Sequence, residues 1–222
     1  MRRIDIPAAP RVVLPVLTAV NVVVFLAWQL MAANAGEAGI AWMSDHFLVS
    51  YTHVFGGRPW VLLTSAVSHV DLYHLLFNTL ALWVFGRDVE AVVGGRGFLH
   101  LYVAGGLLAS VGHVFYGLVI GDPTPALGAS GSVMAVAVVF ASLWPRRLLL
   151  LFFILPMTAR TAVLLFILFD ILGLVGAGVD RIAHAAHLGG ALYGWLYYRN
   201  RLGPYLSQRL QRLRDAARSR IP

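Results

Sequence analysis

The chain contains no cysteine and no lysine, and only 12% of its 222 residues are charged. Without cysteine, neither disulfides nor thiolate metal sites can hold the fold. A soluble domain is nearer half apolar and a quarter charged, whereas 59% of this chain is hydrophobic and its mean hydropathy is +0.76. The scarcity of charge therefore excludes a single soluble core and indicates several membrane-spanning helices of about 20 apolar residues each.

Apolar runs and the breaks between them predict an all-α membrane protein with a bundle of six transmembrane helices. The first run is longer than the roughly 7–15 residues of a signal-peptide core, so we expect it to be retained as a span. The six-span core is expected to cover residues 12–200. The spans are expected at about 12–33, 70–86, 97–120, 129–144, 161–177 and 182–199.

The 17 basic residues, all arginine, predict the orientation of the bundle. If both termini are cytoplasmic, 15 of the 17 lie on the inner side and only Arg58 and Arg181 face outward. This bias is the one that membrane proteins show, and an odd number of spans would break it. Residues 1–11 are therefore expected to be a cytoplasmic segment and residues 201–222 a basic cytoplasmic tail. No soluble domain presents a basic face, so we expect no nucleic-acid partner.

Two connecting segments carry apolar side chains. Residues 34–69 are expected to be a long first loop that lies partly in the membrane surface, because it is rich in aromatic residues. Residues 146–160 are expected to be an interfacial stretch at the membrane edge, since Pro156 and Arg160 interrupt an otherwise overlong apolar run.

A serine flanked by glycines opens the fourth span, in the sequence Gly128-Ala129-Ser130-Gly131. This span is about 22 Å long, against about 30 Å of hydrocarbon, so Ser130 is expected below the outer surface in a wet cavity. The unpaired N–H groups of a helix start would stabilise an oxyanion formed when Ser130 attacks a carbonyl. The structural alternative is packing, because small residues let membrane helices approach closely.

A histidine in the last span could serve as the base. Histidine inside a membrane span usually faces the protein interior. Ala186, Gly190 and Gly194 recur every four residues and predict a smooth helix face, which His187 borders. If that face packs on the fourth span, His187 can take the proton of Ser130.

His74 and Asn78 are four residues apart on the second span, so they share a helix face and could bind an oxyanion. His69 precedes them and could support the loop. No acid stands beside His187 in the sequence, and Asp170 has no evident partner, so the pattern favours a Ser–His dyad over a triad.

A metal site is the alternative use of the histidines. Neither cysteine nor a close carboxylate pattern accompanies them in the sequence, so we expect no metal and no cofactor. The histidines concerned are His69, His74, His184 and His187.

Together these motifs resemble the rhomboid family of intramembrane serine proteases, over about residues 60–194. The matching pieces occur in the order of the family. They are Trp60 with Leu63-Thr64-Ser65, His69, His74-Leu75-Leu76-Phe77-Asn78, Phe85-Gly86-Arg87-Asp88-Val89-Glu90, Gly94, Phe98-Leu99, Tyr102, Gly128-Ala129-Ser130-Gly131 and Ala186-His187-Leu188-Gly189-Gly190.

The resemblance implies that Ser130 is the nucleophile and His187 the general base. It implies that His74, Asn78 and the backbone N–H of Ser130 bind the oxyanion. The supporting positions are His69, Gly128, Gly131, Met134 and Gly190.

The chain departs from the family pattern at two places. Val61 follows Trp60 where the family often has arginine, and Met134 stands where many members stack an aromatic ring on the histidine. Methionine can still pack on a ring through its sulfur. Neither departure removes a reacting group.

By the resemblance, the substrates are single-pass transmembrane proteins cut near the outer face, and one chain suffices for the site. The simplest location is a bacterial plasma membrane, since no organelle-targeting segment is evident. Two alternatives stay open: a catalytically inactive relative that binds and escorts membrane proteins, and a small transporter that uses Asp170 and the histidines.

Overall fold

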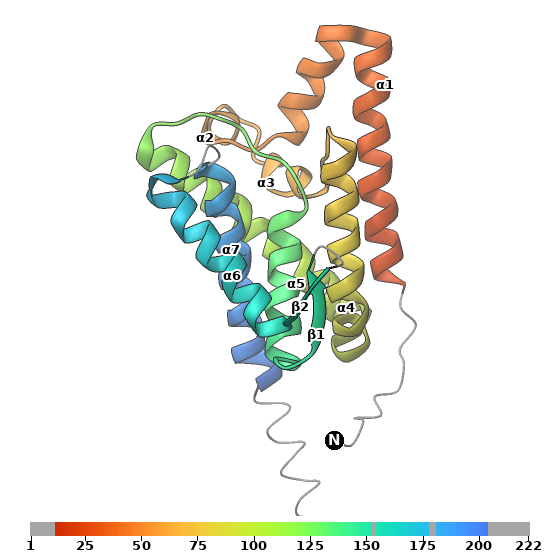
Figure 1. Ribbon diagram of the computed structural model, residues 1–222. Coiled ribbons are helices and arrows are strands. Elements are labelled where there is room, and N and C mark those ends of the chain that lie inside the picture. Colours follow the sequence, from red (N-terminus) through yellow and green to blue (C-terminus); the bar gives the residue numbers. More distant parts are fainter. Residues whose placement is uncertain (1–11, 152–153, 178–180, 204–222) are drawn as a thin grey trace, which may run out of the picture.

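The computed structural model describes residues 12–151, 154–177 and 181–203, which are mainly helical (Figure 1). The expected cytoplasmic segment 1–11 and nearly all of the expected basic tail lie outside these ranges. The elements are α1 (Val13–Phe47), α2 (Tyr51–Phe55), α3 (Val61–Thr64), η1 (Ser65–Val67), α4 (Leu72–Ile120), α5 (Ser130–Leu143), β1 (Leu148–Leu151), β2 (Leu155–Thr158), α6 (Ala159–Leu172), η2 (Gly173–Ala177), α7 (Arg181–Tyr197) and η3 (Tyr198–Leu202).

Two long helices are each broken at a glycine. Gly36 in α1 has φ 56° and Gly94 in α4 has φ 73°, values that glycine adopts without the steric penalty of a Cβ. Each helix turns back at its break, so that the two arms of α4 run in opposite directions (Figure 1). The break expected between residues 86 and 97 therefore lies at Gly94, and the expected end of the second span at residue 86 is too early, because the helix continues to the glycine. The expected loop 34–69 is wrong in part, because α1 extends to Phe47 and three short helices follow.

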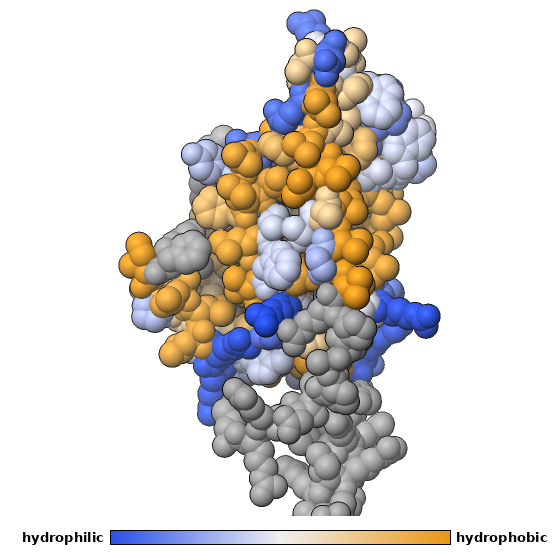
Figure 2. All heavy atoms as spheres, turned by 90° about the vertical axis from the view of Figure 1, so that its right-hand side faces the viewer, coloured by the Kyte–Doolittle hydropathy of each residue, from blue (hydrophilic) through white to orange (hydrophobic). Residues whose placement is uncertain are grey.

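The surface of the helices is apolar enough for a lipid environment. Among the described residues, α1, α4 and the segment Ala159–Gly176 are long and apolar enough to cross a membrane. Large hydrophobic side chains such as Val23 and Leu30 of α1 are more than 60% exposed. Figure 2 shows an orange belt over this side, with blue residues at its two ends. An exposed apolar surface of this extent marks membrane contact, so the chain is an integral membrane protein.

A short β-hairpin separates α5 from α6. β1 and β2 pair antiparallel, with Leu148 opposite Thr158 and Leu151 opposite Leu155. The prediction of an all-α fold is therefore wrong at this point, although the remaining described elements are helical. Arg147, just before β1, forms an ion pair with Asp88 of α4, which ties the hairpin to the bundle.

The centre of the bundle is α5, which packs between α4 and α7 (Figure 1). Close approach depends on residues without bulky side chains. A Cβ at Gly190 of α7 would collide with the carbonyl oxygen of Gly131, and one at Gly194 would collide with that of Ala135. The smooth face predicted on the last span therefore packs on α5, which is the condition that the sequence left open for the role of His187.

A buried carboxylate joins α1 to α4. Glu90 is 1% exposed, and its two oxygens accept hydrogen bonds from the backbone N–H groups of Val13 and Leu14, at 2.9 and 3.2 Å. These N–H groups belong to the first turn of α1, where no partner exists within the helix. Glu90 of α4 thus caps the N-terminus of α1, against which α4 packs.

Candidate active site

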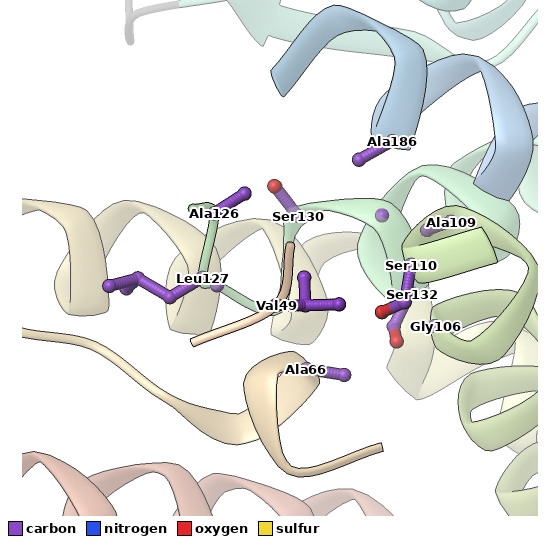
Figure 3. A pocket seen from close by; sticks show the side chains of 12 residues that line it. Val49, Ala66, Gly106, Ala109, Ser110, Ala126, Leu127, Ser130, Ser132 and Ala186 are labelled. Atoms are coloured by element: carbon purple, nitrogen blue, oxygen red, sulfur yellow. The ribbon is translucent and has the colours of Figure 1, made fainter. Parts of the chain in front are cut away.

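Ser130 is the first residue of α5, as the sequence predicts. Its N-terminal neighbour Ala129 offers no side-chain cap to the helix, so the first N–H groups are not satisfied in that way. Ser130 is half-buried, and its hydroxyl points to the side of a pocket where Ala186 of α7 lies (Figure 3). A hydroxyl is thus presented at the positive end of a helix dipole.

The structure brings Ser130 and His187 into contact across the α5–α7 interface. The distance from Ser130 Oγ to His187 Nε2 is 2.8 Å, which is a hydrogen bond. With the proton of the imidazole on Nδ1, Nε2 accepts the hydroxyl hydrogen. The pair then has the geometry of a nucleophile and its base.

Asp170 of α6 completes a polar chain that the sequence analysis missed. Its Oδ1 accepts hydrogen bonds from Nδ1 of His187 at 2.9 Å and from Nδ1 of His184 at 2.7 Å. The expectation that no carboxylate accompanies these histidines is therefore wrong. An ionisable residue inside a span needs a partner, and the i, i+3 spacing of His184 and His187 was the signal that could have supplied it.

His74 lies against Gly128, two residues before Ser130. A Cβ at Gly128 would be 2.7 Å from Cε1 and 2.8 Å from Nε2 of His74, closer than side chains tolerate. Gly128 also has φ 124°, which disfavours any other residue. The imidazole of His74 is therefore beside the backbone that leads into Ser130.

The segment before Ser130 is fixed by backbone hydrogen bonds from the N-terminal part of the chain. Val49 and Ala126 exchange two N–H···O bonds of 2.8 Å, and the N–H of Gly128 donates to the carbonyl of Ser65 at 2.9 Å. These bonds hold the approach to α5 against the short helices that follow α1. A prearranged backbone of this kind is what an oxyanion site needs.

His69, which precedes α4, also holds this segment. Its Nε2 accepts a long hydrogen bond of 3.4 Å from the N–H of Ala129, and its ring packs edge-on against His74, 4.9 Å between centroids. Burial, and to a smaller extent the nearby imidazole of His74, lowers the pKa of His69 to about 4. The ring is therefore neutral at pH 7, which leaves Nε2 free to accept.

Asn78 and Met134 are less directly engaged. The amide nitrogen of Asn78 donates to the carbonyl of His74 at 3.0 Å, one turn earlier on α4. Met134 lies one turn after Ser130 and packs against the hydrophobic core. Packing of the Met134 sulfur on the ring of His187 stays a prediction.

A small cavity of about 40 Å³ lies between α4, α5 and the N-terminal segments. Ser130 lies at one end and the hydroxyls of Ser110 and Ser132 lie toward the other (Figure 3). The Oγ of Ser132 is buried and has no hydrogen-bond partner among the described residues. Most of the lining is apolar, but three serine hydroxyls face this space, and a cavity of this size has room for water.

Comparison with known proteins identifies the sequence pattern around this site. A family model described as "Rhomboid domain" matches residues 56–202. The chain is 33% identical over 189 residues to "RHOMBOID-like protein 12, mitochondrial" of Arabidopsis thaliana, covering 79% of this chain and 54% of that protein. It is 32% identical over 217 residues to "Rhomboid protein 1, mitochondrial" of Saccharomyces cerevisiae, covering 94% and 59%. It is 34% identical over 172 residues to "Rhomboid protease GluP" of Bacillus subtilis, covering 77% and 31%.

These relatives are longer than the chain, which spans between about a third and three fifths of their lengths. Two of the three are mitochondrial by name, and the third comes from a bacterium. The expectation of a bacterial plasma membrane therefore conflicts with the names of the first two relatives.

Proposed function

Because the chain belongs to the rhomboid family, we propose that it is an intramembrane serine endopeptidase with Ser130 as nucleophile and His187 as general base. The observation that carries the proposal is the hydrogen bond of 2.8 Å between Ser130 Oγ and His187 Nε2. The name of the Bacillus subtilis relative, a rhomboid protease, supports the same reaction class.

In the first step, Ser130 Oγ attacks the carbonyl carbon of the scissile peptide bond while Nε2 of His187 takes the hydroxyl proton. The tetrahedral intermediate collapses when His187 returns this proton to the leaving amine. A water molecule then hydrolyses the ester on Ser130 through the same base. Water for this step can reside in the cavity beside Ser130.

The oxyanion of the intermediate forms at the start of α5. The backbone N–H of Ser130, the ring of His74 and the amide of Asn78 are the donors that we assign to it. One N–H of Asn78 is engaged by the carbonyl of His74, but a primary amide has a second. Fixed donors at this position stabilise charge that develops only in the transition state.

Asp170 acts through His187 and is a positioning residue in this proposal. By accepting from Nδ1, it keeps the lone pair of Nε2 directed at Ser130 and stabilises the imidazolium that forms. The reacting pair stays a Ser–His dyad, with a carboxylate behind it.

For the membrane we propose six crossings, with both termini on the cytoplasmic side. The two arms of α4 supply two of them, and α1, α5, α6 and α7 supply one each. Since α5 has only 14 residues, it crosses only part of a bilayer about 30 Å thick. If the C-terminal end of α5 lies at the inner surface, Ser130 at its N-terminal end is submerged below the outer face.

The substrates that fit this placement are single-pass transmembrane proteins, cleaved near the outer face. No cofactor enters the reaction, and one chain supplies every residue assigned to it. The alternative is a family member that binds and escorts membrane proteins without cleaving them. The chain keeps both reacting side chains in contact, which favours the protease.

The test is co-expression with a panel of tagged single-pass membrane proteins. We expect fragments with the native chain, and none with Ser130→Ala. Ser132→Ala is the matched control, because it removes a hydroxyl that lines the same cavity and to which the proposal assigns no role. Fragments of equal amount from Ser130→Ala would refute the assignment, and binding without fragments by the native chain would favour the escort function.

A further inference from the structure

The side chains of Asp170, His184 and His187 converge at the end of the bundle where α6 leads into α7. One ligand atom from each lies within 4.8 Å of the other two. The side chains of Asp170 and His184 are 4% and 11% exposed, whereas that of His187 is 26% exposed and borders the site of Ser130. Glycine at position 173 leaves room for the ring of His184, because a Cβ there would overlap it.

We propose that these three side chains form a zinc-binding site. Imidazole nitrogen and carboxylate oxygen are ordinary zinc ligands, at about 2.0–2.2 Å from the metal. Tetrahedral geometry at those lengths separates ligand atoms by roughly 3.3 Å. Oδ1 of Asp170 is now 2.7 and 2.9 Å from the two Nδ1 atoms, so each of these two separations would open by about half an ångström. The two nitrogens, now up to 4.8 Å apart, would approach by up to about 1.5 Å, which rotation of the imidazole of the more exposed His187 can supply. Three protein ligands leave the fourth position to water.

Zinc at this position would act on the proton of His187. In the structure Nδ1 of His187 is hydrogen-bonded to Asp170 and Nε2 to Ser130. A metal on Nδ1 requires the lone pair of that nitrogen, so on both His184 and His187 the imidazole proton moves through solvent from Nδ1 to Nε2, with no net change in protons. For His187 this changes the hydrogen bond to Ser130. Nε2–H donates to Ser130 instead of accepting from it.

Zinc is therefore an inhibitor of the nucleophile, since the base holds the wrong tautomer. This consequence rests on the proposed function of Ser130 and His187. Binding of the zinc ion is independent of that function, because it needs only the three ligands.

The first measurement is zinc binding by titration calorimetry of the full chain in detergent micelles, purified with a tag free of histidine. We expect the wild type to bind one zinc ion per chain. His184→Asn keeps an N–H near the position of Nδ1 but offers no metal ligand, and it should weaken binding at least about tenfold. The control His100→Asn removes an exposed histidine of α4 and should bind as the wild type does. Absence of saturable binding by the wild type, or unchanged binding by His184→Asn, would overturn the site.

The second measurement is cleavage of a transmembrane substrate against zinc concentration, with each variant referred to its own metal-free rate. We expect the wild type to be inhibited over the range in which it binds zinc, and His184→Asn to resist the same concentrations. Inhibition of both proteins at equal zinc would refute the regulatory role. If the wild type binds zinc as described but cleaves no substrate, the metal site stands and the proposed function fails.

Discussion

Nδ1 of His187 lies 2.9 Å from Oδ1 of Asp170, although the two residues are 17 positions apart and belong to different helices. The contact gives the imidazole one orientation and leaves Nε2 facing Ser130. It also explains how a carboxylate is accommodated inside the bundle, since two imidazole N–H groups satisfy it.

Replacing Asp170 with asparagine should therefore impair catalysis more than substrate binding. The amide N–H can turn toward Nδ1 of His187 and favour the tautomer that carries its proton on Nε2. We expect kcat to fall on the order of 10²-fold or more with KM nearly unchanged. Steady-state kinetics in micelles would measure both, and the exposed Glu37→Gln of α1 controls for loss of one carboxylate. A rise in KM with kcat unchanged would contradict a positioning role.

Gly128→Ala should abolish most activity through His74. The added methyl group would lie 2.7 Å from the ring, so either the imidazole or the approach to Ser130 must move. We expect the rate of cleavage to fall at least about tenfold. We also expect the free energy of unfolding to fall by about 1–2 kcal/mol, because alanine tolerates the positive φ less well than glycine.

Gly57→Ala is the matched control, because Gly57 also has a positive φ but no atom within 4 Å of the added methyl group. Gly57→Ala should lower the Tm about as much as Gly128→Ala does, because both place alanine at a positive φ, but it should keep the activity of the wild type. Equal activity in the two variants would show that the contact with His74 is unimportant.

Glu90→Gln should lower stability without affecting the chemistry. The amide can present only one oxygen to the N–H groups of Val13 and Leu14, so the first turn of α1 loses part of its cap. We expect a loss of about 1–2 kcal/mol, seen as a lower Tm in micelles. A Tm equal to that of the wild type would contradict the capping role.

His69 predicts a dependence of stability on pH. Because its pKa is about 4 in the folded chain and about 6.5 when unfolded, the unfolded state binds more protons between these values. The contribution of neutral His69 is fully present above pH 6.5 and is lost as the pH falls toward 4. His69→Gln should flatten the curve of Tm against pH in this window, and an unchanged slope would contradict the assignment.

The sequence predicted the parts of this protein that depend on local pattern. The start of α5 at Ser130 follows from its glycines, and the face of α7 that carries Gly190 and Gly194 follows from their spacing. The hairpin was missed because four consecutive leucines, residues 148–151, carry no periodicity that separates a strand from a helix.

The partners of Asp170 and Glu90 could not be predicted because they depend on how distant segments pack. The i, i+3 spacing of His184 and His187 places two imidazoles on one face of α7 and makes them candidates, but it does not show that this face meets a carboxylate of α6. No local pattern indicates that α4 caps α1. A carboxylate within an apolar span indicates that a hydrogen-bonding or charged partner must exist. Only the tertiary arrangement identified it.

The most direct test of the account is labelling of the purified chain with a fluorophosphonate probe, followed by mapping of the adduct by mass spectrometry. The hydrogen bond from Ser130 to Nε2 of His187 predicts one adduct, on Ser130. Ser132→Ala should be labelled as the wild type is, and Ser130→Ala should not be labelled. An adduct on any other serine, or undiminished labelling of Ser130→Ala, would contradict the central claim that Ser130 and His187 form the reacting pair.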